Sequence, residues 1–321
     1  MSGKYFINTY GCQMNVHESE KLAGILRERG YEEAKSQEEA DVIVFNTCCV
    51  RETAEDHVLG NLGIVKKLKE SKPDIKVAVC GCMTQKPGAE AALKKRCPFI
   101  NIIFGTHNLH KFGEYLDKLE TRKYIGEVWN DEGEIPEDVP VYRTSGVNAW
   151  VNIMYGCNNF CTYCIVPYTR GRERSRKPED IVAEIKNLVN DGVREVMLLG
   201  QNVNSYRGIS ADGTQTDFAD LIARINEIEG LARIRFMTSH PKDISDKLIA
   251  AYGTCEKLCH YIHLPVQAGS SKVLREMNRH YTREAYLQKV EKLRAVDPDM
   301  AISTDIIVGF PGETEAEFEE T

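Results

Sequence analysis

The chain has 321 residues, of which 42% are hydrophobic and 28% charged, and its formal net charge is −7. This composition is typical of a globular protein with one or two domains, and the negative charge argues against a broad electrostatic grip on nucleic acid. No apolar run approaches the roughly 20 residues of a membrane span, and strand-like sequence starts at Lys4, so no signal peptide is expected. Eleven cysteines therefore favour a cytoplasmic, reducing location and metal ligation over disulfides.

The N-terminal third alternates between strand and helix patterns. The predicted strands cover residues 4–9, 42–45, 77–79 and 102–104, and the predicted helices cover residues 18–29, 54–68, 89–95 and 109–119. Repeated β-α units imply an open parallel sheet with helices on both faces, of the flavodoxin-like α/β type.

Three cysteines come just after the first three of these strands. They are Cys12, Cys48 and Cys82. Ligands bind at the carboxyl ends of the strands in open parallel sheets, so the three thiols could converge on one site. The alternative is that they only pack in the interior, as free cysteines often do. Spacing alone leaves Cys49 and Cys80 as competing candidates.

A domain boundary is predicted between residues 121 and 142. This stretch has no periodicity, is acidic, and contains Pro136 and Pro140, which interrupt helices. The expected organisation is a domain at 1–120, a linker at 121–142 and a second domain at 143–321.

A further group of three cysteines opens the second domain. Cys157, Cys161 and Cys164 have Cys-x3-Cys-x2-Cys spacing and follow a strand-like run at 149–154. Cubane iron–sulfur clusters usually have four thiolate ligands, so three leave one iron open, as in catalytic metal sites. A zinc knuckle or a redox pair is the alternative. Zinc would need a fourth ligand, and the nearest downstream histidine is His240.

Strand and helix patterns resume after this motif. Strands are predicted at 149–154, 196–199, 234–237, 261–264 and 302–308, with helices starting at Pro178, Asp217 and Thr282. We interpret this pattern as a partial (βα)6 barrel whose strand ends build the active site. Turn formation and helix capping explain part of the polar residues there, with Ser270 and Thr314 as expected N-caps.

Residues 170–177 contain five basic side chains in eight positions. Such a run is either a solvated face or a contact for an anionic substrate, made by Arg170, Arg172, Arg174 and Arg176. The pattern of a capped helix at 314–318 stands near the end of the sequence, and no sixth barrel strand is visible. We therefore expect a truncated chain.

Residues 155–164 resemble the cluster motif of radical S-adenosylmethionine (SAM) enzymes, and residues 155–172 are the most specific part of a resemblance to the methylthiotransferases. Residues 9–15, 46–48 and 81–82 are similar to the three motifs of the N-terminal domain in the methylthiotransferase family. The resemblance implies that Cys157, Cys161 and Cys164 hold the SAM-cleaving [4Fe–4S] cluster. It also implies an auxiliary [4Fe–4S] cluster on Cys12, Cys48 and Cys82, in preference to Cys49 and Cys80. The implied SAM-binding residues are Tyr163, Gly200, Gln201, Asn202, Ser239, His240, Gln267 and Asp305.

The resemblance also implies a reaction. Two SAM molecules are used per turnover, one to methylate a cluster sulfur and one to generate a 5′-deoxyadenosyl radical. The implied substrate is carbon 2 of N6-isopentenyladenosine in a tRNA anticodon stem-loop, and the implied electron donor is a flavodoxin or ferredoxin. A monomer without membrane contact is expected, and family members carry a further C-terminal RNA-binding β-domain.

Three alternatives remain open. Within the family, the substrate could be threonylcarbamoyladenosine in tRNA or an aspartate of a ribosomal protein. A different class of protein is a non-catalytic, metal-binding RNA-interaction module, which would be colourless and hold zinc.

Overall fold

The computed structural model describes residues 3–49, 52–131, 133, 135–143 and 146–321. It divides into two compact units, one formed by Met1–Thr144 with Tyr168–Gly171, the other by Ser145–Pro167 with Arg172–Thr321. Within the described ranges, no helix combines the length and apolar character that crossing a bilayer requires.

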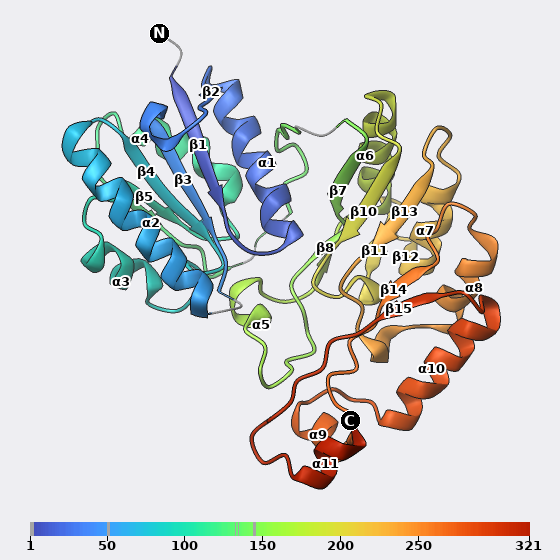
Figure 1. The fold of residues 1–321 in the computed structure, drawn as a ribbon. Helices are drawn as coiled ribbons and strands as arrows, with labels where there is room; N and C mark the ends of the chain where they lie inside the picture. Colours follow the sequence, from blue (N-terminus) through green and yellow to red (C-terminus); the bar gives the residue numbers. More distant parts are fainter. Residues whose placement is uncertain (1–2, 50–51, 132, 134, 144–145) are drawn as a thin grey trace. The chain divides into compact units, whose positions relative to one another are not determined.

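The first unit is built on a six-stranded sheet in which all neighbouring strands are parallel (Figure 1). The sheet order is β2-β1-β3-β4-β5-β6. The strands are β1 (Lys4–Thr9), β2 (Glu32–Glu33), β3 (Val42–Thr47), β4 (Lys76–Gly81), β5 (Ile102–Phe104) and β6 (Ile125–Glu127). This arrangement confirms the open parallel α/β sheet.

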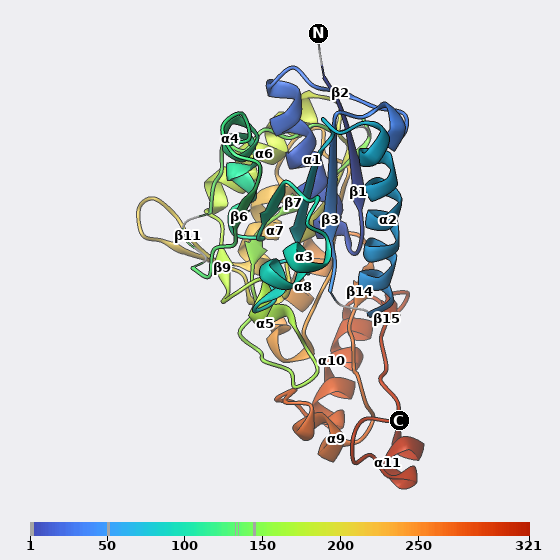
Figure 2. The ribbon, with the colours of Figure 1, turned by 90° about the vertical axis from the view of Figure 1, so that its left-hand side faces the viewer.

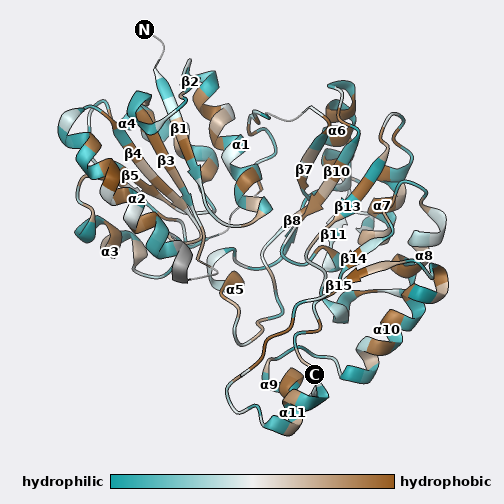
Figure 3. Cartoon of the chain, viewed as in Figure 1, coloured by the Kyte–Doolittle hydropathy of each residue, from teal (hydrophilic) through white to brown (hydrophobic). Residues whose placement is uncertain are grey.

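Helices cover both faces of this sheet. They are α1 (Gln13–Glu28), α2 (Glu52–Ser71), α3 (Ala89–Arg96) and α4 (Phe112–Lys118), with short 3-10 turns η1 (Gln37–Glu39) and η2 (Leu109–Lys111). Successive side chains of β3 enter opposite cores: Val42 and Val44 pack with residues of α1 and α4, and Ile43 and Phe45 with residues of α2. Figure 2 shows α1 and α2 on opposite sides of β3, and Figure 3 shows the apolar character of the central strands.

The predicted linker needs correction. Residues Ile125–Glu127 form β6, which pairs in parallel with β5, and Val139 and Tyr142 pack against the core shared with α1. A three-residue edge strand is too short to show periodicity, and Gly126 at its centre gives no strand signal.

The second unit carries two groups of parallel strands. β7 (Asn148–Asn152), β10 (Glu195–Leu199) and β13 (Arg233–Phe236) form one sheet, and β14 (Tyr261–His263) pairs with β15 (Ala301–Ser303). A single parallel bridge between Ile234 and Leu258 connects the region of β13 to the residues before β14. The five strands thus follow one another in chain order, as a partial (βα) barrel requires. The predicted strand at 302–308 ends at Ser303, after which only one bridge, between Gln267 and Ile306, is formed.

The helices of the second unit begin close to the expected positions, except α8, which was not predicted from the sequence. They are α6 (Pro178–Asn190), α7 (Phe218–Asn226), α8 (Asp246–Thr254), α9 (Ser271–Glu276), α10 (Arg283–Val296) and α11 (Glu315–Glu320). The side chains of Asp217, Thr282 and Thr314 accept capping hydrogen bonds, whereas Ser270 occupies the N-cap position of α9 without making one.

Several short elements of the described chain have no counterpart in the predictions. They are β8 (Met154–Tyr155), α5 (Val166–Thr169), β9 (Arg174–Ser175), η3 (Val203–Ser205), β11 (Arg207–Ile209), β12 (Gln215–Asp217), η4 (Pro241–Asp243), and, among the longer ones, α8. Segments of two to four residues are below the length at which periodicity is readable.

Candidate functional site

The sheet of the first unit brings three cysteines to its carboxyl edge. Cys48 and Cys82 directly follow β3 and β4, and Cys12 lies three residues after β1. The strand order reverses between β1 and β3, because β2 lies on the far side of β1. Ligand sites of doubly wound sheets lie at such a switch point, so Cys12 and Cys48 flank the position where a ligand is expected.

Two glycines allow neighbouring segments to approach closely at this edge of the sheet. Gly11 has a φ of +109°, and a Cβ there would stand 2.6 Å from Cys48 Cβ and 2.9 Å from its Sγ. Gly81 has a φ of +96°, and a Cβ there would overlap the carbonyl oxygen of Thr47. Both positions therefore require glycine for backbone conformation and for close approach.

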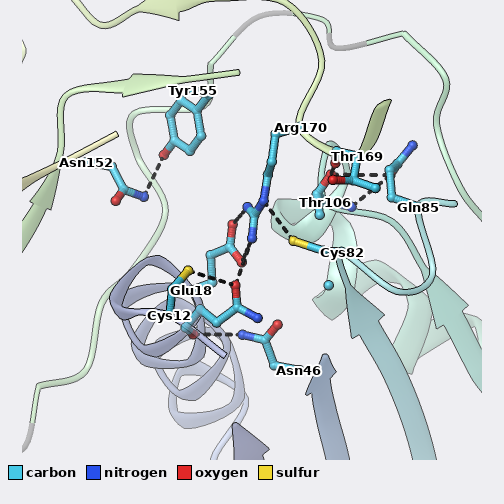
Figure 4. Close-up of polar contacts among 12 residues, drawn as sticks. Cys12, Glu18, Asn46, Cys82, Gln85, Thr106, Asn152, Tyr155, Thr169 and Arg170 are labelled. Carbon is cyan, nitrogen blue, oxygen red and sulfur yellow. Dashed lines mark hydrogen bonds and ion pairs between the residues drawn. The ribbon is translucent and has the colours of Figure 1, made fainter. Parts of the chain in front are cut away.

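A buried arginine reaches these thiols from much later in the chain. Within the first unit, Arg170 Nε donates to Cys82 Sγ at 3.1 Å and Nη2 donates to Asn15 Oδ1 at 2.9 Å (Figure 4). The same guanidinium forms an ion pair with Glu18. The pKa of Cys82 is lowered to about 6, mainly by a hydrogen bond from Cys49 and further by the charge of Arg170. Cys82 is thereby prepared to be a thiolate.

Cys80 and Cys49, the competing candidates, have raised thiol pKa values instead. Cys80 lies inside β4 in the hydrophobic core, and burial raises its pKa well above the ordinary value. The pKa of Cys49 is also raised, first by its hydrogen bond to Cys82 and then by burial. Cys82 lies past the end of β4 beside Arg170, whereas Cys80 lies inside the strand in the core, so the geometry favours Cys82 over Cys80 as a ligand. The preference for Cys48 over Cys49 stays a prediction from the resemblance.

The second group of cysteines lies on the loop between β8 and α5. A turn joins Cys164 N to Cys161 O at 2.9 Å, and Phe160 adopts a φ of +48°. The pKa of Cys157 is raised to about 11, mainly by burial and further by Glu173, Cys164 and Cys161. The mutual effect of the thiols shows that they share one neighbourhood.

One side chain of the motif and several from outside it hold this loop. Asn159 Nδ2 donates to Cys157 Sγ at 3.6 Å, and Lys242 Nζ donates to Asn159 Oδ1 at 2.6 Å. Arg279 Nη1 donates to Cys161 Sγ at 3.3 Å, and Asn278 Nδ2 donates to two loop carbonyls at 3.0 Å. Sequence reasoning missed Lys242, Asn278 and Arg279, because single polar residues after a strand or a short helix carry no pattern.

The donor chemistry fits iron–sulfur clusters. Across the described ranges, no three His, Cys, Asp or Glu side chains are grouped closely enough to hold a single metal ion. Each unit nevertheless has three cysteines close in the backbone, at neighbouring strand ends in the first unit and on one loop in the second. Three thiolates are the donor set of a cubane cluster with one open iron.

Two of the predicted SAM-binding residues offer buried atoms without partners. Ser239 Oγ and His240 Nε2 are buried, and no hydrogen-bond partner exists for either within the described structure. Burial, aided by Arg279 and Lys242, lowers the pKa of His240 to about 2, so its imidazole is neutral. Buried polar atoms normally have partners, so these two are suited to receive a polar ligand.

Three other predicted SAM-binding residues have structural contacts. Gln201 Oε1 accepts from Gly156 N at the start of the cysteine loop. Asn202 Nδ2 donates to Asp243 at 2.7 Å, and its Oδ1 accepts from His240 N at 3.2 Å. A Cβ on Gly200 would stand 2.5 Å from Met154 Cγ. These residues therefore position the loop and strand ends.

The last three predicted residues lie in different surroundings. Tyr163 is 40% exposed, whereas Gln267 is buried with a φ of +72°. Asp305 lies 3.4 Å from His263 Nε2, and its carbonyl accepts from Gln267 N at 3.0 Å. The structure thus brings Gln267 and Asp305 together through the backbone.

A cavity of about 660 Å³ adjoins the cysteine loop in the second unit. Asn158, Asn159 and Lys242 line its polar side, and Phe218 and Leu248 contribute apolar surface.

The basic run is not a continuous exposed face. Arg170 and Arg176 are buried, and Arg176 Nη1 donates to Glu184 and to Asn152 O, both at 2.7 Å. Neither guanidinium can meet a phosphate there, which corrects their predicted role in substrate contact. Arg172 is exposed and lies over the ring of Phe160 at 4.3 Å. Arg174 is partly exposed and lies 5.9 Å from the ring centre of Tyr155.

Comparisons with known proteins identify the family. Residues 151–321 match the Radical SAM superfamily, and residues 4–105 match Uncharacterized protein family UPF0004. The chain is 58% identical over 319 residues to a protein of Clostridium beijerinckii named tRNA-2-methylthio-N(6)-dimethylallyladenosine synthase. That match covers 99% of this chain and 70% of the relative. A Clostridium perfringens protein of the same name is 56% identical over 324 residues, covering 100% and 72% of the two chains.

Two solved structures share the fold. The cobalamin-dependent S-adenosylmethionine radical enzyme OxsB has a TM-score of 0.66 at 13% identity, covering 99% of this chain and 51% of that one. The radical S-adenosylmethionine methyltransferase TsrM from Kitasatospora setae has a TM-score of 0.65 at 13% identity, covering 99% and 69%. With these matches, the chain belongs to the radical SAM superfamily and, within it, to the family of tRNA-2-methylthio-N(6)-dimethylallyladenosine synthases.

Proposed function

We propose that this protein is a tRNA methylthiotransferase acting on carbon 2 of N6-isopentenyladenosine beside the anticodon. One observation carries the proposal: identity of 56–58% to synthases named for this product, over 99–100% of the chain. Threonylcarbamoyladenosine and a ribosomal-protein aspartate are the rival substrates for the same chemistry, and the names of the relatives favour the isopentenyl nucleoside.

The six cysteines would have two roles. Cys157, Cys161 and Cys164 would hold the SAM-cleaving [4Fe–4S] cluster, and a sulfur-donating one would lie on the first group, Cys12, Cys48 and Cys82. When bound, the clusters and two SAM molecules supply the one-electron chemistry and the sulfur that an inert aromatic C–H bond requires.

The chain's own residues prepare these sites. Asn159 and Arg279 donate hydrogen bonds to the thiols of Cys157 and Cys161. Arg170 stabilises the thiolate of Cys82. His240, kept neutral by burial, would offer Nε2 to a polar group of SAM without adding charge beside its sulfonium.

The partners are part of this proposal. The substrate would be the anticodon stem-loop of tRNA, and a flavodoxin or ferredoxin would supply electrons to a cytoplasmic, monomeric enzyme. The first unit would carry the auxiliary cluster and the second unit the SAM-cleaving one.

The test is anaerobic incubation of the reconstituted protein with SAM, a reductant and tRNA containing N6-isopentenyladenosine. Mass spectrometry of the digested nucleosides should show the 2-methylthio derivative. A methylthio product on threonylcarbamoyladenosine, or only on a ribosomal protein, would contradict the proposed substrate.

Two variants separate the roles of the clusters. Cys161→Ala should abolish reductant-dependent formation of 5′-deoxyadenosine. Cys12→Ala should keep SAM cleavage but lose the methylthio product. Zinc in place of iron in the parent protein, with no SAM cleavage, would instead identify a non-catalytic module.

A further inference from the structure

Arg279 is a buried cation whose nitrogens are all engaged. Its side chain belongs to the second unit and is 5% exposed. Nη1 donates to Cys161 Sγ at 3.3 Å, Nη2 to Pro265 O at 3.0 Å and Nε to Tyr281 Oη at 3.1 Å. Tyr281 Oη in turn donates to Val266 O at 2.8 Å, so the guanidinium is held in one orientation.

Among the described residues, this arginine has no carboxylate counterion. Three arginines are buried within the described ranges: Arg170, Arg176 and Arg279. The first two pair with Glu18 and Glu184, whereas no described Asp or Glu forms an ion pair with Arg279. A buried charge is costly unless it is paired, so the site needs an anion that the protein's carboxylates do not provide.

The anion expected at this place is the cluster with its thiolates. Arg279 contacts the sulfur of Cys161, and a single thiol in its protonated form would not neutralise it. Three thiolates carry one more negative charge than an oxidised cubane core carries positive, and reduction by one electron adds another. A fixed cation therefore stabilises the reduced state more than the oxidised one.

We propose that Arg279 is a positioning residue that supplies the counter-charge of the cluster on Cys157, Cys161 and Cys164. It raises the midpoint potential of that cluster and so makes its one-electron reduction easier. This inference rests on the proposed function, since it requires a cluster at these thiols. It predicts no such role for Arg176, which is equally buried but is bonded to Glu184 and Asn152.

The experiment measures the midpoint potential of the cluster, and this quantity does not depend on turnover. Cys12, Cys48 and Cys82 are replaced by alanine in the full chain, so that one cluster remains, and Arg279→Gln is added. After the iron content is checked, anaerobic redox titration followed by electron paramagnetic resonance gives the reduced fraction. We expect Arg279→Gln to lower the reduced-to-oxidised ratio at a fixed potential at least tenfold, which is about 59 mV for one electron.

Two further variants make the result specific. Arg279→Lys keeps the charge and should stay within tenfold of the parent. The matched control, Arg176→Gln with Glu184→Gln, removes a similarly buried guanidinium that is paired with a carboxylate, and it should titrate as the parent does. Parent-like titration of Arg279→Gln would overturn the proposal, as would an equal shift in the control.

If Arg279→Gln does not bind a cluster, the iron content of the variants gives the outcome instead. If Arg279→Gln fails to bind iron while Arg279→Lys binds it, the counter-charge is supported. If neither binds iron, the proposal is overturned, because side-chain shape rather than charge then governs assembly. A parent protein that binds no cluster at Cys157, Cys161 and Cys164 would instead refute the proposed function itself.

Discussion

Arg170 and Glu18 form an ion pair in the interior of the first unit, although 152 residues separate them in sequence. Their side chains are only 5% and 6% exposed, and Arg170 Nη2 lies 3.0 Å from Glu18 Oε2. Thr106 Oγ1 donates to Thr169 O at 2.8 Å beside this pair. Tyr168–Gly171 thus belongs to the first unit, although it comes just after the cysteine motif of the second.

Loss of Arg170 should destabilise the protein strongly. Arg170→Met leaves the carboxylate of Glu18 buried without its counterion, and we expect a loss of about 3–5 kcal/mol in the free energy of unfolding. Arg170→Met with Glu18→Leu should recover most of it. The control is Lys111→Met, which breaks a more exposed pair with Glu114 and should cost about 1 kcal/mol or less. Anaerobic urea unfolding measures all three, and equal losses in Arg170→Met and Lys111→Met would contradict the prediction.

Iron content should report the two groups of cysteines separately. Two cubane clusters on six thiolates predict about eight iron atoms in the parent chain and about four after Cys12→Ala, Cys48→Ala or Cys82→Ala. Cys80→Ala should keep about eight, because Cys80 is a protonated core residue. Loss of four irons in Cys80→Ala but not in Cys82→Ala would reverse the assignment.

Gly81 should not tolerate a side chain. Its φ of +96° is strained for alanine, and a Cβ would overlap Thr47 O and stand 2.6 Å from Thr47 N. We expect Gly81→Ala to cost about 2–5 kcal/mol and to disturb the adjacent Cys82. Gly88→Ala is the matched control, since its φ is +74° but no atom lies within 4 Å of a Cβ, so only about 1–2 kcal/mol should be lost. Thermal unfolding of the two variants separates crowding from backbone strain.

His240 should make stability depend on pH. Because burial lowers its folded pKa to about 2, the unfolded chain binds a proton below about pH 6.5 and the folded chain does not. The stability contributed by the neutral imidazole is thus complete above pH 6.5 and decreases as the pH falls. Between pH 7 and pH 5 the parent should lose about 2 kcal/mol more than His240→Gln.

Urea unfolding at both pH values checks this. A His240→Gln variant with parental pH dependence would show that the imidazole is not held neutral.

Arg172 should contribute to tRNA binding. It is exposed above Phe160, unlike the buried Arg170 and Arg176. Arg172→Gln should weaken tRNA binding and reduce the slope of log affinity against log salt by about 1. It should cost only about 1 kcal/mol or less in stability, since the contact with Phe160 is exposed. Filter binding across a salt series measures the slope, and an unchanged slope would exclude a phosphate contact.

Much of the fold could be predicted from local patterns in the sequence. Buried runs such as Val42–Thr47 and capped helix starts such as Pro178 and Thr282 were predictable, since their signals lie within a few residues. The same locality explains the failures: β6 is three residues long, and the predicted strand after Ser303 lacks a continuous partner among the described residues.

The sequence by itself determined that two groups of three cysteines would follow strand ends, because strand patterns and cysteine spacing are both local. Only the tertiary structure decided which thiols and charges are buried together. It placed Cys80 in the core and Cys82 beside Arg170, and it buried Arg170 and Arg176 within an apparently exposed basic run. It also left Arg279 without an ion pair to any described carboxylate. The physical reason is that burial and counter-charge depend on which elements pack together in space, as for Arg170 and Glu18 at 152 positions apart, and no local pattern records this.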